Sequence, residues 1–243
     1  KRFLKSNMSN FYVVIPARLN SKRFPNKVIA NLFGEIMIQK IYKACEKSKA
    51  KKVYIATDDK SLSDLCLGFT KNVMLTSSEH RNGTERVFEV AKNLNFVDDD
   101  IVINVQCDMP DVSPINIDFL ASMVCKTGSI CTLYTELSKE QLTDENTVKL
   151  ALNNDSQIID FIRKTYKNSG EKFKKHVGMY GYNFSFLKKY MSLNQTNSEI
   201  SLSLEQMRFH ENDYFFNGYE AIIDPGVSID SPEDLDNYIH HNE

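Results

Sequence analysis

Four cationic side chains lie within a short stretch directly after the first apolar segment of the chain. The stretch reads P-A-R-L-N-S-K-R-F-P-N-K at residues 16–27, and its cations are Arg18, Lys22, Arg23 and Lys27. Guanidinium groups match the geometry of phosphate oxygens, and a lysine supplies a compact positive charge. The loop therefore predicts a polyphosphate site. The alternative interpretation is a solvated basic loop, because surface loops are commonly charged.

Two aspartates are candidates for holding a divalent cation. Asp108 follows the apolar segment 101–105, and Asp230 stands just before the sequence S-P-E-D at 231–234. Mg²⁺ prefers oxygen ligands and takes one or two carboxylates together with phosphate oxygens. Each aspartate also has a simpler interpretation, Asp108 as a loop-capping residue and Asp230 as part of the start of the next helix.

Further candidates carry a weaker signal. The sequence N-G-T-E-R at 82–86 opens a predicted helix, where Gly83 permits close backbone approach and the helix N-terminus suits a base edge or an anion. Thr84 as a plain N-cap is the alternative. Arg163 and His176 fall in a less regular part of the chain, and a lone histidine is usually a structural residue.

An alternating pattern of strands and helices in the first half of the chain must position these residues. Short apolar segments alternate with amphipathic segments, which predicts a mostly parallel sheet covered by helices on both faces. Ligands bind such sheets beyond the carboxyl ends of the strands, where the cationic loop and Asp108 follow. The predicted strands are 11–16, 52–57, 72–75, 101–105 and 130–136. The predicted helices are 36–48, 60–69, 84–94 and 114–126.

After about residue 137 the pattern becomes less regular and favours antiparallel pairing. The predicted strands there are 148–152, 157–162, 176–183 and 220–223, and the predicted helices are 202–209 and 231–239. The last helix begins with Ser231 as N-cap, a proline and two acids. Residues 168–175 are polar and predict a mobile loop. We expect one domain at 11–243, divided into 11–136, 137–219 and 220–243, behind a tail at 1–10.

Composition excludes several classes of protein. The 243 residues carry 30 Lys+Arg and 32 Asp+Glu, a net charge of −2, which argues against a strongly basic nucleic-acid-binding surface. No apolar run approaches the roughly 20 residues of a membrane helix. Five cysteines without a C-x-x-C pair indicate reduced thiols in a cytoplasmic protein. No G-x-G-x-x-G or P-loop motif occurs, so a bound nucleotide must be held by side chains and other turns.

Taken in order along the chain, several motifs together resemble the 3-deoxy-manno-octulosonate (Kdo) cytidylyltransferases, the CMP-Kdo synthetases of the nucleotidyltransferase superfamily. The matching stretches are V-I-P-A-R-L-N-S-K-R-F-P-N-K (14–27), A-T-D-D (56–59), N-G-T-E-R (82–86), I-N-V-Q-C-D-M-P (103–110), H-V-G-M-Y-G-Y (176–182), L-E-Q-M-R (204–208) and S-I-D-S-P-E-D-L (228–235). The resemblance covers nearly the whole chain from residue 11 onward. It implies a homodimeric α/β enzyme that uses CTP and Mg²⁺ to activate a sugar acid, with no nucleic acid or membrane as partner.

The resemblance also implies roles for the matched residues. Arg18, Lys27, Asp108 and Asp230 are expected to be catalytic, and both aspartates are expected to hold Mg²⁺. Arg18, Ser21, Arg23 and Lys27 are expected to bind the triphosphate. Residues of the N-G-T-E-R motif are expected to bind the nucleotide, with Thr84 and nearby backbone reading the cytosine; they include Gly83, Thr84 and Arg86. The residues expected to face the sugar acid are Gln106, Arg163, His176, Glu205 and Gln206.

At several positions the chain departs from the family pattern. Cys107 and Met109 stand where the family usually has Gly and Glu, Asn26 replaces a glycine, and Leu202 aligns with an additional Glu. Around Arg163 the sequence reads F-I-R-K-T-Y instead of a Ser-Arg followed by Ile-Pro. These departures leave two alternatives open. The acceptor is 8-amino-Kdo or another nonulosonate, or the chain is a catalytically inactive nucleotide-binding relative.

Overall fold

The computed structural model describes residues 10–21, 23–165 and 173–242. The main sheet contains β1 (Phe11–Ala17), β4 (Lys52–Thr57), β5 (Val73–Leu75), β6 (Ile101–Val105), β7 (Ile130–Thr135), β8 (Lys149–Leu152), β9 (Ile158–Ile162), β10 (Lys174–Asn183) and β11 (Phe216–Glu220). A short hairpin is formed by β2 (Asn31–Leu32) and β3 (Glu35–Ile36). The helices are η1 (Lys27–Ile29), α1 (Met37–Glu46), α2 (Lys60–Leu67), α3 (Gly83–Asn93), α4 (Pro114–Thr127), α5 (Lys139–Thr143), α6 (Phe184–Ser192), α7 (Asn197–Leu202), α8 (Met207–His210) and α9 (Pro232–Asn242).

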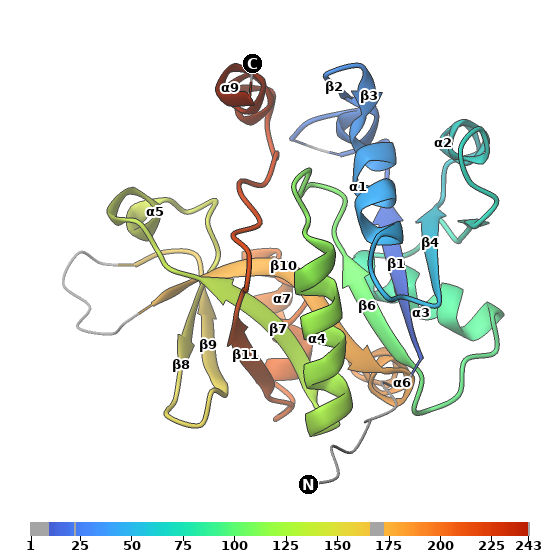
Figure 1. Cartoon of the computed structure of the whole chain (residues 1–243). Helices are drawn as coiled ribbons and strands as arrows, with labels where there is room; N and C mark the ends of the chain where they lie inside the picture. Colours follow the sequence, from blue (N-terminus) through green and yellow to red (C-terminus); the bar gives the residue numbers. More distant parts are fainter. Residues whose placement is uncertain (1–9, 22, 166–172, 243) are drawn as a thin grey trace, which may run out of the picture.

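The sheet changes character along its width. Strands β6, β1, β4 and β5 are neighbours and all parallel, whereas β10 is antiparallel to both β6 and β7. Strands β8 and β9 form an antiparallel extension beside β10. The predicted α/β fold, with a mostly parallel central sheet and a smaller antiparallel part, is confirmed. The parallel strands place the loops after β1 and β6 at one edge, on the side where α9 lies (Figure 1).

Alternating side chains of the central strands fill two hydrophobic cores. In β1, Val13 and Ile15 pack on one face with α1 and α4, while Val14 packs on the other with α3 and α6. The figure shows α1 and α4 in front of the sheet (Figure 1). Both faces are buried because the pleat sends successive side chains to opposite sides. The rigid sheet therefore holds its carboxyl-end loops in fixed positions.

Two of the predicted elements are wrong. The predicted strand 220–223 lies too late in the sequence, since β11 covers Phe216–Glu220 and pairs in parallel with β7. Ile222 and Ile223 are exposed instead, and their amides donate to Asn116 Oδ1. The predicted helix 202–209 is broken by Ser203, whose φ is +52°, so α7 ends at Leu202 and α8 begins at Met207.

Other elements were not predicted from the sequence. The hairpin β2–β3 and the helices α5 and α6 are absent from the sequence prediction, and β10 begins two residues earlier than predicted, at Lys174. The predicted mobile loop 168–175 falls partly on residues 166–172, which lie outside the described residues. The first-half strands and helices otherwise match the prediction to within a few residues. The proposed division of 11–243 into three parts stays a prediction.

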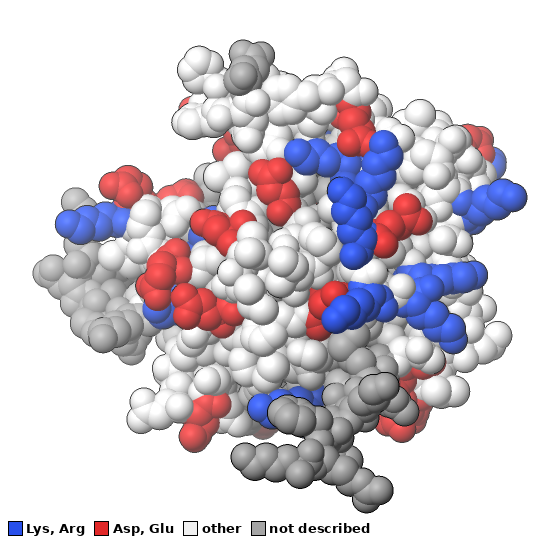
Figure 2. Space-filling model, in the orientation of Figure 1, with Lys and Arg blue, Asp and Glu red and all other residues white. Residues whose placement is uncertain are grey.

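Charge is distributed unevenly over the face shown in Figure 2. Basic side chains gather over the half that contains α1 and α2, and acidic side chains gather over the half that contains β7, β11 and α5. Both signs are present on this face. Within the described ranges of the chain, no helix combines the length and apolar character needed to cross a membrane.

Candidate active site

The loop after β1 folds back on itself and returns Lys27 to the sheet edge. The amides of Ser21 and Asn26 both donate to Leu19 O, at 3.0 and 2.9 Å. Asn26 has φ +61°, in the left-handed region that glycine and asparagine adopt most readily. The replacement of the family's glycine by Asn26 therefore preserves the turn. Lys27, the first residue of η1, becomes a buried cation as a result.

Lys27 lies between the two aspartates that sequence analysis selected. Its Nζ is 3.4 Å from Asp108 Oδ2 and 3.0 Å from Asp230 Oδ1. Arg23 Nη2 donates to the same Asp230 oxygen at 2.9 Å. Burial by itself lowers the pKa of Lys27, but the two carboxylates outweigh burial and raise it. Thus Asp108, Asp230, Lys27 and Arg23 come together from two loops and the C-terminal segment.

Asp108 and Asp230 are joined through the backbone as well. Ile229 N donates to Asp108 O at 2.9 Å, and Ile229 is fully buried in the core. Burial raises the pKa of Asp108 above its ordinary value, and the nearby Lys27 ammonium opposes this rise. An anionic Asp108 therefore depends on nearby positive charge, from Lys27 or from a bound cation.

The chemistry of the donor set is compatible with Mg²⁺. Two carboxylates at one sheet edge supply hard oxygen ligands, and Mg²⁺ commonly completes its six positions with phosphate oxygens and water. Among the described residues, no group of three or more His, Cys, Asp or Glu side chains could hold a metal. The aspartate pair is therefore suited to a cation that arrives with a phosphate ligand and unsuited to a site made only of protein side chains.

Arg18 and Arg86 bring further positive charge to the same end of the sheet. Arg86 is fully buried, lies 3.2 Å from Asp58 Oδ2 through Nη2 and donates to Thr76 Oγ1 through Nη1. Burial lowers the pKa of Arg86, and the neighbouring Arg18 adds to this lowering. One terminal nitrogen of Arg18 is buried and has no hydrogen-bond partner among the described residues. Two like charges and a buried donor without a partner indicate a place for an anion.

The N-terminus of α3 is closed by a carboxylate from a distant part of the chain. Asn82 caps the helix by accepting from Glu85 N at 3.0 Å, and Thr84 N donates to Glu205 Oε2 at 3.1 Å. At Gly83 a Cβ would lie 3.0 Å from Gln106 Nε2 and 3.2 Å from Pro16 Cγ. A side chain at this position would therefore have to displace Gln106 or Pro16. The Thr84 amide, which was expected to lie near the cytosine, donates its hydrogen bond to Glu205.

Gln106, Glu205 and Gln206 lie together behind this helix start. Gln106 Nε2 donates to Glu205 Oε1 at 3.3 Å, and Tyr180 OH donates to Gln206 Oε1 at 3.2 Å. Burial raises the pKa of Glu205, although Thr84 N lowers it. Gln206 Nε2 is buried and has no partner among the described residues. Gln206 borders a cavity of about 10 Å³ that is also lined by Thr84, Tyr180, Tyr182, Tyr190, Glu205, Phe209 and Phe216.

A buried network of charges that sequence analysis missed joins two of the motifs. Arg208 donates to Glu85 at 3.0 Å and to Glu199 at 2.8 and 2.6 Å, and all three side chains are nearly inaccessible to solvent. The Arg208 guanidinium also lies 4.1 Å from the centre of the Tyr190 ring. Asn82 Nδ2 donates to Tyr190 OH and to Glu199. The sequence carried a signal for this network, because Glu85 in N-G-T-E-R and Arg208 in L-E-Q-M-R are charged residues of opposite sign in two neighbouring motifs of the site.

Arg163 and His176 are occupied by contacts within the protein. Arg163 donates through Nε to Leu202 O at 2.7 Å and through its terminal nitrogens to carbonyls of residues 145, 146 and 203. His176 lies in β10, and its Nε2 is 3.1 Å from Thr132 Oγ1. Burial lowers the pKa of His176 to about 3, and nearby Arg163 adds to the effect, so the imidazole is neutral. Their contact with a sugar acid stays a prediction.

The departures from the family pattern lie mainly in the protein interior. Cys107 and Met109 are 6% and 3% exposed and belong to the core shared with α1 and α4. Burial raises the pKa of the Cys107 thiol, which makes it a poor nucleophile at neutral pH. Leu202 packs against the other core. These side chains therefore fill hydrophobic space, and a carboxylate at Met109 would be buried in the same core.

Comparison with known proteins agrees with this arrangement. The family described as Cytidylyltransferase matches residues 12–222. The chain is 33% identical over 249 aligned residues to a 3-deoxy-manno-octulosonate cytidylyltransferase of Francisella tularensis subsp. novicida, covering 94% of this chain and 97% of that protein. It is 36% identical over 239 residues to the protein of the same name from Pseudoalteromonas translucida, covering 93% and 94%.

Solved structures show the same relationship. A CMP:2-keto-3-deoxy-manno-octonic acid synthetase complexed with CTP superposes with a TM-score of 0.87 at 28% identity, covering 96% of this chain and 98% of that chain. A cytidylyltransferase from Leptospira borgpetersenii matches with a TM-score of 0.62 at 14% identity, covering 95% and 85%, which shows the fold alone. The near-complete coverage and the convergence of Lys27, Asp108 and Asp230 lead to one conclusion: this chain is an enzyme of the cytidylyltransferase family.

Proposed function

We propose that the chain transfers CMP from CTP to the anomeric hydroxyl of 3-deoxy-D-manno-octulosonate and releases pyrophosphate. The product would be the activated sugar for lipopolysaccharide or another surface glycan. The observation that carries the proposal is the meeting of Asp108 and Asp230, from distant parts of the sequence, on the Lys27 ammonium. The relatives are 3-deoxy-manno-octulosonate cytidylyltransferases, which supports the acceptor, and the CTP complex of the similar solved structure supports the nucleotide.

In this proposal the cations bind and orient the triphosphate. Arg18 offers its buried donor without a partner, and Arg23 and Lys27 exchange part of their pairing with carboxylates for phosphate oxygens. The acceptor hydroxyl oxygen forms a bond to the α-phosphorus, the bond from that phosphorus to the bridging oxygen breaks, and pyrophosphate leaves. Holding both reactants in line and opposing the charge that develops on the phosphoryl oxygens lowers the barrier.

Asp108 and Asp230 would hold Mg²⁺ at the same edge. The ion, when bound, would neutralise phosphate charge and orient the α-phosphoryl group for attack. The carboxylates act here as ligands, and the proton of the acceptor hydroxyl passes to solvent. Ser21, in the turn between Arg18 and Arg23, is placed to contact the triphosphate in this proposal.

On the acceptor side we propose that Glu205 and Gln206 face the sugar acid, with Gln106 between them and the nucleotide. Gln206 Nε2, which lacks a described partner, would donate to a substrate oxygen. Arg163 and His176 would shape this side, with any direct contact made through atoms that their present partners leave accessible. Gly83, Thr84 and Arg86 would position the nucleotide from the start of α3.

Neither alternative acceptors nor an inactive chain is favoured by a specific observation. Met109 and Cys107 lie in the hydrophobic core, and Asn26 preserves the left-handed turn. The departures that raised those alternatives are therefore accommodated by packing and backbone geometry. Arg23, Lys27, Asp108 and Asp230 form ion pairs at the edge proposed to bind phosphate.

Pyrophosphate release measured with CTP and a panel of acids tests the function. We expect turnover with 3-deoxy-D-manno-octulosonate that requires Mg²⁺, and a lower kcat/KM with 8-amino-Kdo and with other nonulosonates. A higher kcat/KM with one of those acids would reassign the acceptor. Absence of pyrophosphate release with every acid would favour the inactive relative.

We further propose that the enzyme is a cytoplasmic homodimer, with neither nucleic acid nor membrane as partner. Exposed Ile222 and Ile223 lie beside α4 because the Asn116 side chain binds their backbone, and Ile115 of α4 is exposed as well. A second copy would cover this apolar group, since exposed patches of this kind mark contact surfaces.

Light scattering after gel filtration tests the dimer. The measured mass should be twice that of one chain, and Ile222→Asp should shift it toward the mass of one chain. An unchanged mass for I222D would mean that the interface lies elsewhere on the surface. Fractionation of cells tests the proposed cytoplasmic location of the enzyme.

A further inference from the structure

The segment that carries Asp230 has little regular structure of its own. Residues 221–231 contain no helix or strand in the described chain, and they run from β11 to α9. Within this segment Asp230 is preceded by buried Ile229, whose amide donates to Asp108 O. The position of the Asp230 carboxylate therefore depends on how the two ends of the segment are anchored.

One end is anchored by a cluster that we name the α9 anchor and define as Lys40, Asp111 and Tyr238. Tyr238 OH donates to Asp111 Oδ1 at 2.7 Å, and Lys40 Nζ donates to Tyr238 OH at 2.8 Å. Lys40 Nζ also lies 3.2 Å from Asp111 Oδ1. The anchor joins α9 to α1 and to the loop after β6, the same loop that carries Asp108.

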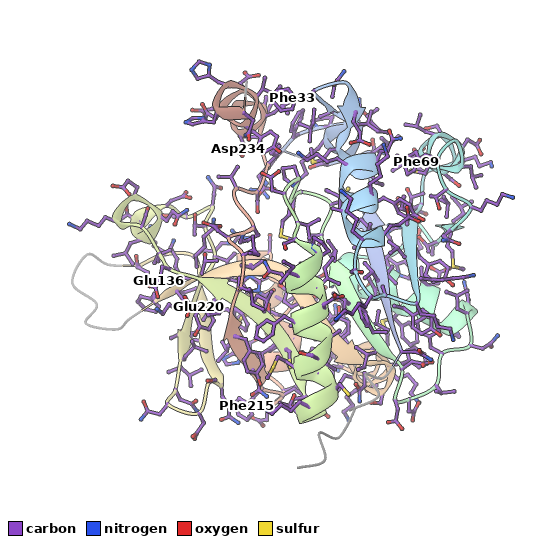
Figure 3. All side chains as sticks on the ribbon, in the orientation of Figure 1. Phe33, Phe69, Glu136, Phe215, Glu220 and Asp234 are labelled. Carbon is purple, nitrogen blue, oxygen red and sulfur yellow. The ribbon has the colours of Figure 1, made fainter. Side chains whose placement is uncertain are left out.

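The anchor lies where α9 meets the β2–β3 hairpin. Tyr238 is 3% exposed, and its ring centre is 6.3 Å from that of Phe33, at the tip of the hairpin. Figure 3 labels Phe33 and Asp234 at this end of the molecule. The buried ring supplies packing, while the hydroxyl supplies a directional link to Asp111.

The first turn of α9 connects the anchor to Asp230. Asp234 Oδ2 accepts from the amides of Asp230 and Ser231, at 2.9 and 2.8 Å, and from Ser231 Oγ. Tyr238 is one turn further along the same helix, so its position is transmitted through a short rigid unit. At Gly226, with φ +74°, a Cβ would lie 3.3 Å from Asp111 Oδ2, so Asp111 also packs against the segment before Asp230.

We infer that Tyr238 is a positioning residue for the carboxylate pair: through Asp111 it fixes the position of Asp230 beside Asp108, where the two carboxylates would hold a divalent cation. The inference rests on the proposed function, because it assumes that these carboxylates bind the cation. In the described part of the chain the Tyr238 hydroxyl bonds to Lys40 and Asp111 but to neither Asp108 nor Asp230. Its effect must therefore pass through geometry, as for outer partners that orient metal ligands.

Tyr238→Phe tests the inference by removing the hydroxyl while keeping the ring. Tyr42→Phe is a matched control, because Tyr42 is also buried on this face of the sheet and its hydroxyl donates to Glu46 and accepts from Thr70. Mn²⁺ binding would be measured by electron paramagnetic resonance in the presence of CTP and without acceptor. We expect the dissociation constant for Mn²⁺ to rise about tenfold in Y238F and to stay unchanged in Y42F.

Hydrogen exchange without any ligand gives a second readout. The amides of Ile229, Asp230 and Ser231 should exchange faster in Y238F than in wild type and at the wild-type rate in Y42F. Equal Mn²⁺ affinities for Y238F and wild type would overturn the inference, whereas absence of Mn²⁺ binding by wild type with CTP would overturn the proposed function. Should Y238F fail to fold, Lys40→Met removes one hydrogen bond of the same hydroxyl, and the same rise in dissociation constant is expected.

Discussion

The proposed phosphate side and the proposed acceptor side of the site are held together in different ways. On the phosphate side, Lys27 and Arg23 pair with the carboxylates of Asp108 and Asp230, and these partners are themselves candidates for binding ligand. On the acceptor side, Arg163 donates only to backbone carbonyls in the hydrogen bonds described here. On the first side, therefore, charged side chains pair with one another. On the second side, the charged side chain of Arg163 is held by hydrogen bonds to the backbone.

This difference separates groups that can exchange partners from groups that cannot. A phosphate oxygen or a cation can replace one ion of the Lys27 cluster without exposing a buried backbone group. Freeing Arg163 would leave carbonyls at residues 202 and 203 without their donors, which costs free energy wherever they are buried. We therefore expect substitutions on the phosphate side to change turnover more than stability, and substitutions near the acceptor side to do the reverse.

The largest expected effect tests the framework near the acceptor side. Arg208→Met leaves Glu199 as a buried carboxylate without its cation and leaves Glu85 with Arg81 alone, so the free energy of unfolding should fall by about 3–5 kcal/mol. Urea denaturation measures this. Lys60→Met, which breaks an exposed pair with Asp64, is the control and should change little. A stability loss for R208M no greater than that of K60M would mean that the buried network does not hold this side together.

The next effect tests the phosphate side. Asp108→Asn keeps the shape of the side chain but removes an anionic ligand, so pyrophosphate release at saturating CTP should fall about a hundredfold or more. Both aspartates are proposed to bind the same ion. Adding Asp230→Asn to D108N should therefore reduce turnover much less than Asp230→Asn does in the wild type. Asp64→Asn on the surface of α2 serves as control. Near-normal turnover of D108N at saturating Mg²⁺ would contradict the role in metal binding.

A pH dependence follows from the neutral histidine on the acceptor side. Because the folded-state pKa of His176 is about 3 and its ordinary value is 6.5, the unfolded chain binds a proton between these values that the folded chain excludes. The free energy of unfolding therefore falls as the pH drops below 6.5. His176→Gln should remove about 2 kcal/mol of the loss between pH 7 and pH 5.

Urea denaturation at the two pH values measures this effect. His240→Gln, at an exposed position of α9, is the control: its free energy of unfolding should fall between the two pH values as much as that of the wild type. If the free energy of unfolding of H176Q falls between pH 7 and pH 5 as much as that of the wild type, the imidazole becomes charged in the folded protein. Such a result would remove the contrast between an exchangeable phosphate side and a fixed acceptor side.

The smallest effect concerns Arg23, whose side chain is 55% exposed. Arg23→Ala should raise the KM for CTP about tenfold and leave the KM for the sugar acid nearly unchanged, because the guanidinium lies on the phosphate side. Steady-state kinetics with each substrate varied in turn measures both constants. A change confined to the sugar acid would invert the assignment of the two sides.

The first half of the fold was predictable because local patterns there agree with the tertiary structure. Buried parallel strands such as β6 read as short apolar runs, and α4 begins with Ser113 as N-cap and Pro114 at its first position. The second half was less predictable for a physical reason. Ser203 adopts a left-handed conformation that nothing in its side chain requires, and Ile222 is exposed because Asn116 binds the backbone there.

By itself, the sequence determined the ionic chemistry of the phosphate side. Carboxylates and cations follow the carboxyl ends of parallel strands, and their types favour a phosphate with a hard cation as the proposed ligand. The tertiary structure alone decided which groups are free to act, because burial and hydrogen bonding depend on residues far apart in the chain. Arg208 meets Glu85 only after α8 packs against α3, and Tyr238 meets Asp111 only after α9 returns to the loop after β6. Pairings of that kind are set by three-dimensional packing, which no local pattern of residues encodes.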